Sequence, residues 1–444
     1  MRFVSTRSSS LQDSVSFKEA VLNSIPRDGG LYVPQGEEDF RRWILYADEN
    51  TSFASLAGSL TSALINTEFS PIICETIATH AFTWEPKVTR LDDNTFYLNL
   101  YTGPTGTFKD FGVSYLTSTL ETILQMDGQK SILLDATTGE LGACMAKALR
   151  GKRLVKSVLL APKGSFRGME ESDFVWNGGN IYPIEIDGTS EDCNSIVRKI
   201  FAMPELVQKY HLTVANTANI GRLLPQVFFY TYAFSQIKKN VSGDIYYALH
   251  CGHYGNLMAG LYAWKFSLPA NGFIMPTTKN VLLDARGNCI MPDSMIPLSE
   301  RKPIDPSDPS NLERLEHIFA ANSLLLRNFL YPAAVTAKQT EEACKELFTK
   351  YHIYADSQTS AAYASALMRK DVIEDDDGAV VLIARNDPCG ENDFVRHCLG
   401  EEAPVSKNRE DASRKTSILR PSVVSSDVES VISVLNSLNL LRLF

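Results

Sequence analysis

The sequence contains no apolar run long enough to cross a membrane. Its uninterrupted apolar stretches all fall well short of the ~20 residues that span a bilayer, and the opening MRFVSTRSSSLQDSVSF contains no stretch of signal-peptide length. Asp13 also argues against an organelle-targeting peptide, although this segment contains Arg and Ser. We therefore expect a cytoplasmic protein.

The sequence also has no excess of positive charge. The 444 residues carry a formal net charge of -9, whereas affinity for nucleic acid comes largely from clustered Lys and Arg. Eight cysteines are scattered along the chain without a C-x-x-C pair or a His/Cys cluster at zinc spacing. These absences exclude nucleic acid as a main partner and predict reduced thiols and no metal site. They still allow a local pocket for a small phosphate.

What is present is the composition of an ordinary globular protein, with 44% hydrophobic and 21% charged residues. A single hydrophobic core stops growing at roughly 250 to 300 residues. A chain of this length therefore predicts two or three domains.

The order of expected elements indicates an α/β protein. A helix over 16–25 begins with a capping box formed by Ser16 and Glu19, and residues 38–82 predict several amphipathic helices. Short apolar runs, alternating with helix-compatible stretches, predict strands at 95–101, 131–134, 157–161, 181–184, 245–249 and 379–384. This alternation is typical of mostly parallel sheets. Residues 374–378 predict a solvated acidic loop, 399–425 a surface connection, and 428–444 a final amphipathic helix.

Lys109 stands in the segment GPTGTFKDFG, between Phe108 and Phe111, after an expected strand and at the start of an expected helix. Loops after the carboxyl ends of strands are where such sheets bind ligands. Apolar surroundings lower the pKa of a lysine amine and make it a nucleophile toward aldehydes. Alone, the pattern fits a surface lysine with a buried stem more often than a catalytic one.

Two further loops lie between an expected strand and an expected helix. They are ATTGELG at 136–142 and CGHYGN at 251–256. Free backbone N–H groups at a helix start suit a carboxylate or a phosphate, and glycine lets the backbone approach such a group closely. Each loop also fits a capped helix without a ligand.

In their order along the chain these segments resemble the threonine synthase family of fold-type II pyridoxal-phosphate (PLP) enzymes. STR at 5–7, VSF at 15–17 and DGGLYVP at 28–34 are similar to the family's opening, and GPT followed by FKDFG is similar to its PLP-lysine motif. The resemblance implies pyridoxal 5'-phosphate as cofactor and Lys109 as its Schiff-base residue. It also implies two α/β domains with open, mostly parallel sheets and a mainly helical N-terminal unit.

The implied domain boundaries follow from the same resemblance. The N-terminal unit covers 1–90, the large PLP-binding domain 91–130 and 216–400, the small α/β domain 131–215, and the C-terminal connection and helix 401–444.

The resemblance also assigns the other site residues. Cofactor-binding positions are Lys109, Phe108, Gly252, His253, Tyr254, Gly255, Asn256 and Arg385. Substrate-binding positions are Thr137, Thr138, Gly139, Glu140, Gly142, Lys163, Asn216 and Asn219. For Lys163 and for Arg314, a surface Lys and a helix-face Arg remain alternatives to a phosphate contact.

Several positions depart from the family's pattern. Where the family has T-A-H-P, with the Thr facing the pyridine nitrogen, this chain has Arg385 followed by NDP. Arg385 either takes the place of the Thr hydroxyl or points away from the pyridine nitrogen. In the first case the guanidinium would keep that nitrogen unprotonated, and PLP would be a weaker electron sink. Glu140 and Leu141 replace Asp-Thr, and Gln358 replaces His. Cys251 and His253 replace Ser and Asn, with His253 a possible base or a hydrogen-bonding substitute.

The implied reaction converts O-phospho-L-homoserine and water into L-threonine and phosphate, with Lys109 as general acid and base. The expected partner is thus a small phosphorylated amino acid, bound by a monomer or homodimer without nucleic acid or membrane. A phospho-lyase releasing 2-oxobutyrate, ammonia and phosphate is one alternative. A non-catalytic PLP-binding relative is another, although the presence of Lys109 argues against it.

Overall fold

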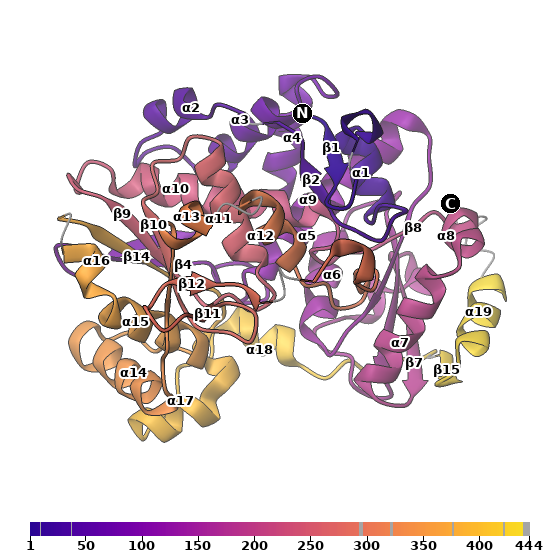
Figure 1. Ribbon diagram of the computed structural model, residues 1–444. Helices are drawn as coiled ribbons and strands as arrows, with labels where there is room; N and C mark the ends of the chain where they lie inside the picture. Colours follow the sequence, from indigo (N-terminus) through magenta and orange to yellow (C-terminus); the bar gives the residue numbers. More distant parts are fainter. Residues whose placement is uncertain are drawn as a thin grey trace.

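The computed structural model describes residues 1–8, 10–36, 38–292, 296–319, 323–374, 377–420 and 422–437. Two mostly parallel sheets lie side by side, and the N-terminal unit lies along one edge of both (Figure 1). Among these residues no helix is both long and apolar enough to cross a membrane. Positions 375–376 of the predicted acidic loop and 438–444 of the predicted final helix lie outside the described residues.

The N-terminal unit is mainly helical, as predicted. Its helices are α1 (Phe17–Asn23), α2 (Arg41–Tyr46), α3 (Phe53–Ile65) and α4 (Pro71–Ala81), and its strands β1 (Phe3–Ser5) and β2 (Tyr32–Pro34) pair antiparallel. The predicted capping box is present at α1. The Ser16 hydroxyl accepts a hydrogen bond from the Glu19 backbone N–H, and the Glu19 carboxylate accepts one from the Ser16 N–H.

The large sheet has six described strands in the order β13-β10-β9-β14-β4-β3. They are β3 (Lys87–Arg90), β4 (Thr95–Asn99), β9 (Ile245–Ala248), β10 (Gly272–Pro276), β13 (Leu330–Ala333) and β14 (Ala379–Ala384). β3 is antiparallel to β4, and the other pairs are parallel. The central strands are buried on both faces, which explains why they appear as continuous apolar runs in the sequence.

Helices cover both faces of the large sheet. Tyr247 of β9 packs into the core that includes α3, α5 (Lys109–Asp127), α10 (Val227–Ile237) and α11 (Gly255–Lys265). Its neighbour Tyr246 points to the other face, toward α14 (Ala337–Tyr351) and α15 (Ser357–Met368). Shorter elements around this sheet are α9 (Ile220–Leu223), α12 (Leu312–Phe319), α13 (Ser323–Arg327), α16 (Lys370–Glu374), α17 (Asn392–Leu399), β11 (Leu282–Leu283) and β12 (Cys289–Ile290).

The small sheet is parallel throughout, in the order β15-β7-β6-β5-β8. Its strands are β5 (Ile132–Ala136), β6 (Lys156–Pro162), β7 (Ile181–Asp187), β8 (Leu212–Thr213) and β15 (Ser422–Ser425), with helices α6 (Glu140–Leu149), α7 (Ser190–Phe201) and α8 (Pro204–Tyr210). The final helix α19 (Val428–Ser437) packs against this sheet through Val431 and Leu435.

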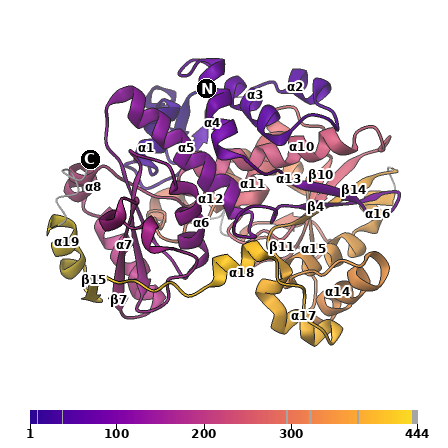
Figure 2. The same ribbon diagram turned by 180° about the vertical axis from the view of Figure 1, so that it is seen from behind.

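The C-terminal segment that the sequence predicts as a surface connection over 399–425 contains two elements that were not predicted. It forms α18 (Lys407–Ser413) and then β15, which pairs parallel with β7. Figure 2 shows this yellow segment crossing from the large sheet to the small one. β3 of the large sheet and β15 of the small sheet therefore both lie outside the residue ranges predicted for those two domains. The division into domains stays a prediction.

Candidate active site

The loop before Lys109 is tied to the end of β14. The Phe108 N–H donates to the Arg385 carbonyl (2.8 Å), and the Asp387 N–H donates to the Gly106 carbonyl (3.0 Å). The buried Asp110 carboxylate accepts from the Thr105 N–H (2.8 Å) and hydroxyl (2.7 Å), although burial raises the pKa of Asp110. These bonds hold the loop so that α5 begins at Lys109, at the carboxyl edge of the large sheet.

Lys109 forms an ion pair rather than lying in apolar surroundings, so that part of the prediction is wrong. Its Nζ donates to Glu140 Oε2 at 2.6 Å, and both side chains are about one-third exposed (35% and 36%). The other carboxylate oxygen, Oε1, accepts from Arg409 Nη2 of α18 at 3.0 Å. Burial favours the neutral form of Glu140, but Lys109 and Arg409 outweigh it and lower the pKa of Glu140 to about 2.

The predicted substrate-carboxylate loop forms the start of α6. The buried Thr137 hydroxyl accepts from the N–H groups of Gly139 and Gly142, each at 3.0 Å. Gly139 has a φ of 130°, a conformation that favours glycine. The Thr137 hydroxyl is thus used in capping α6, whereas Thr138 is exposed beside it.

The predicted phosphate loop leads into α11. Gly252 and Tyr254 have positive φ values of 53° and 64°, and the Tyr254 N–H donates to the Cys251 carbonyl (2.8 Å). Asn311 holds the loop from behind, because its backbone and side-chain N–H groups donate to the His253 carbonyl at 3.0 and 3.1 Å. The loop is therefore a preorganised turn at a helix N-terminus.

The side chains of this loop point in different directions. His253 is exposed, with Nε2 at 3.6 Å from a carboxylate oxygen of Asp308. The Tyr254 hydroxyl shares a hydrogen bond with Thr278 (2.7 Å). Asn256 is buried, with its amide bonded to Gln226 (3.3 Å) and to Tyr230 (3.0 Å). The backbone of the loop, rather than these side chains, is what the fold presents to a ligand.

Arg385 joins the lysine loop to the phosphate loop. Its guanidinium carbon lies 5.2 Å from the centre of the Phe108 ring, and a Cβ placed at Gly252 would lie 3.3 Å from Arg385 Nη1. The guanidinium also donates to Gln358 at the start of α15. Arg385 is buried, and burial lowers its pKa. A buried cation thus stands between the two loops predicted to hold the cofactor.

Other predicted residues have mainly structural contacts. Asn219 is fully buried and caps α9, and its amide donates to the Val21 carbonyl (2.8 Å) and the Thr213 hydroxyl (3.1 Å). Asn216 Nδ2 donates to the Pro306 carbonyl (2.6 Å). Lys163 is exposed. Thr217, between the two asparagines, lies against Gly255, which links this segment to the phosphate loop.

Two residues of this region, Arg409 and His250, are not among the site residues that the sequence predicts. Arg409 comes from the C-terminal segment, and its contact with Glu140 carries no local signal. His250 follows β9, so its position at the carboxyl end of a strand could have identified it. Its Nδ1 accepts from the Gly252 N–H (3.3 Å), and burial together with the charge of Arg385 lowers the pKa of His250 to about 4.

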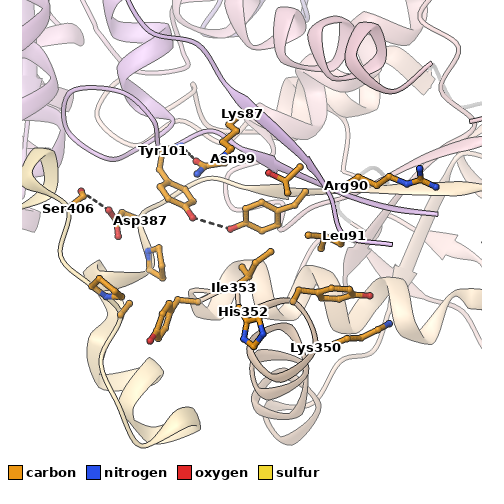
Figure 3. Close-up of a pocket in the computed structure, with 17 residues that line it drawn as sticks. Lys87, Arg90, Leu91, Asn99, Tyr101, Lys350, His352, Ile353, Asp387 and Ser406 are labelled. Carbon is orange, nitrogen blue, oxygen red and sulfur yellow. Dashed lines mark hydrogen bonds between the residues drawn. The ribbon is translucent and has the colours of Figure 1, made fainter. Parts of the chain in front are cut away.

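A cavity of about 640 Å³ lies next to this region but is lined by other residues. Figure 3 shows Tyr101, Asn99, His352, Asp387 and Ser406 around it. None of the predicted cofactor or substrate residues is among those that line it. Within the described part of the chain, no group of three or more His, Cys, Asp or Glu residues could hold a metal ion.

Comparison with known proteins identifies the family. Residues 81–384 match the family model described as pyridoxal-phosphate dependent enzyme, and residues 2–82 match threonine synthase N terminus. Threonine synthases of Serratia marcescens and Escherichia coli (strain K12) are each 29% identical, over 89% of this chain and 90% and 91% of theirs.

Solved structures show the same fold. The chain superposes on Escherichia coli threonine synthase with a TM-score of 0.75 and 24% identity, covering 98% of this chain and 100% of that one. For PLP-bound threonine synthase of Brucella melitensis the TM-score is 0.80, with 21% identity and 98% and 99% coverage. The predicted fold class is confirmed. Because the two family models together account for residues 2–384, the chain belongs to the pyridoxal-phosphate-dependent enzymes and, within them, to the threonine synthase family.

Proposed function

We propose that the protein is a threonine synthase that converts O-phospho-L-homoserine and water into L-threonine and phosphate. The observation that carries the proposal is the position of Lys109, whose amine is accessible at the carboxyl edge of the large sheet and contacts Glu140 at the N-terminus of α6. The relatives named threonine synthase align over 89% of the chain, which supports the same assignment.

The residues present fit PLP. A partly exposed amine suits its aldehyde, and the glycine-containing turn at the start of α11 suits its phosphate. Phe108 and Arg385 lie between these two places and would flank the ring. When bound, PLP supplies the electron withdrawal that makes protons at Cα and Cβ of an amino acid acidic.

The protein residues then have distinct tasks. The Lys109 amine would move protons at the substrate carbons, and Glu140 would hold that amine when it is protonated. Thr138 and the backbone at Gly139 would bind the substrate carboxylate at the start of α6. Lys163, exposed directly after β6, is proposed for the substrate phosphate.

The phospho-lyase remains a second candidate because of Arg385. A cation there would disfavour protonation of the pyridine nitrogen and so weaken the electron withdrawal that PLP supplies when bound. The phospho-lyase would share the loss of phosphate with the synthase, but water would then release 2-oxobutyrate and ammonia instead of adding at Cβ. For either reaction we expect a cytoplasmic monomer or homodimer.

One experiment separates these functions. Purified protein with PLP is mixed with O-phosphohomoserine, and phosphate, threonine and 2-oxobutyrate are measured together. Equal amounts of phosphate and threonine would establish the synthase, and phosphate with 2-oxobutyrate would establish the lyase. Borohydride reduction followed by mass spectrometry should place PLP on Lys109. A Lys109→Ala variant that keeps the same visible spectrum would contradict the assignment.

A further inference from the structure

We propose that Arg409 of α18 is a positioning residue for the Lys109 amine and acts through Glu140. Arg409 lies beyond residues 81–384, the part of the chain that matches the PLP-enzyme family model. The inference rests on the proposed role of Lys109 and extends the site to the segment that the sequence predicts as a surface connection.

The contacts of α18 attach it to the lysine loop. Ser406 caps the helix by accepting from the Arg409 N–H (3.2 Å), and its hydroxyl donates to Asp387 Oδ2 (2.9 Å). Asn408 Nδ2 donates to the Gly103 carbonyl (3.0 Å). Because the Asp387 N–H in turn binds the Gly106 carbonyl, α18 is fastened to the loop that ends at Lys109.

Gly390 makes room for the Arg409 side chain, and Gly106 lies in ordinary contact with it. A Cβ placed at Gly106 would lie 3.5 Å from Arg409 Cβ, and a Cβ placed at Gly390 would lie 2.8 Å from Arg409 Nη2. The side chain is only 15% exposed. The guanidinium is therefore held in one place, and that place is against Glu140.

The ion pairs divide the two oxygens of Glu140 between two cations. Oε2 accepts from Lys109 and Oε1 from Arg409. The other acidic groups near Lys109 are Asp110, whose carboxylate is bonded to Thr105, and Cys144, whose thiol has a pKa raised by burial. Glu140 is thus the carboxylate that the Lys109 amine contacts, and Arg409 holds its other oxygen.

The division of charge has a chemical consequence. An amine attacks an aldehyde only in its neutral form, and a neighbouring carboxylate favours the ammonium form. With Arg409 present, part of the negative charge of Glu140 is neutralised by the guanidinium. Without Arg409, the whole charge would act on Lys109, which would then be neutral only at higher pH.

The test measures Lys109 directly and requires no PLP. Competitive labelling with acetic anhydride at several pH values, read by mass spectrometry, gives the pH midpoint at which the Lys109 amine becomes reactive. We expect Arg409→Met to move this midpoint upward by about one pH unit. Glu140→Gln should move it downward, and Arg409→Lys should restore most of the wild-type midpoint because the cation is kept.

The double variant separates positioning from packing. In a Glu140→Gln background, Arg409→Met should shift the midpoint less than it does in wild type, because only the direct repulsion between the guanidinium and the Lys109 ammonium is then removed. An equal shift in both backgrounds would overturn the proposal. Gly390→Ala is a second route if Arg409→Met folds poorly, since the added methyl group displaces the guanidinium without removing a charge. It should shift the midpoint in the same direction as Arg409→Met, and an unchanged midpoint would count against the proposal.

The result is independent of the reaction catalysed. A labelling shift in a protein that forms no covalent link with PLP would support the ion-pair arrangement and refute the proposed function. A protein that makes threonine but shows no labelling shift in Arg409→Met would keep the function and refute this inference.

Discussion

Replacing Arg314 by Met should destabilise the protein strongly. Arg314 was open to two interpretations in the sequence, a helix-face residue or a phosphate contact, and the structure supports neither. It is fully buried in α12. It donates to the carbonyls of Tyr32 (3.0 Å), Thr217 (2.5 Å) and Ala218 (3.1 Å) and to Asn311 Oδ1 (2.6 Å). It therefore ties the N-terminal unit and the 216–219 segment to the residue that holds the phosphate loop.

The contacts set the size of the effect. A hydrogen bond from a charged donor contributes about 1.5–3 kcal/mol, so four of them amount to at least about 6 kcal/mol. Burial of the charge opposes this and lowers the pKa of Arg314 from its usual value to about 10. That change corresponds to roughly 3 kcal/mol. We expect Arg314→Met to lower the free energy of unfolding by about 3 kcal/mol, a large part of the total stability of ordinary domains.

Urea denaturation followed by circular dichroism measures this loss. Arg314→Lys is the matched control, since it keeps the charge but cannot reach all four acceptors, and it should lose an intermediate amount. The affinity for PLP should also fall in Arg314→Met, because Asn311 loses the partner of its side-chain oxygen. A Met variant within about 1 kcal/mol of wild type would refute the reasoning, because uncompensated buried acceptors alone should cost more.

Three further predictions concern the site. Arg385→Thr should increase threonine formation per phosphate released if the guanidinium faces the pyridine nitrogen; an unchanged product ratio would show that it does not. Asn311→Ala should weaken PLP binding about tenfold, measured by fluorescence titration, because the His253 carbonyl loses its side-chain donor and keeps only the backbone N–H of residue 311. The lowered pKa of Glu140 means that its ion pairs stabilise the fold above about pH 4.5 and are lost as the pH falls toward 2. Melting temperatures of Glu140→Gln should therefore depend less on pH in that range than those of wild type.

The parts of the fold that the sequence predicts well are those with local causes. The capping box of α1 requires only Ser16 and Glu19, three residues apart, and it is present. The strands β5, β6, β9 and β14 are apolar because both of their faces are buried, so each appears as a short hydrophobic run. β8 has only two residues, and β15 exists because it pairs with β7, far away in the chain. No local pattern indicates such pairing.

The same distinction between local and long-range causes holds for the site residues. Lys109 and the two helix-start loops could be located because each follows a strand. The partners of Lys109 could not, since Glu140 is 31 positions away and Arg409 a further 269 positions beyond it. The direction of a side chain within a loop was equally hidden, and both Asn219 and Asn256 turn into the core. A motif thus locates a backbone position, whereas the tertiary packing decides which charges meet there.

The departures from the family's pattern occur in contacting groups. Arg385, which stands where a Thr is expected, donates to Gln358, which stands where a His is expected. Glu140, which stands where an Asp is expected, lies between Lys109 and Arg409. A site decaying without function would accumulate buried charges without partners, which are costly to keep. Here each altered charge is matched by a group of complementary chemistry, and the lysine remains at the centre. This pattern favours an enzyme whose active site has been retuned over a binding protein that has lost one.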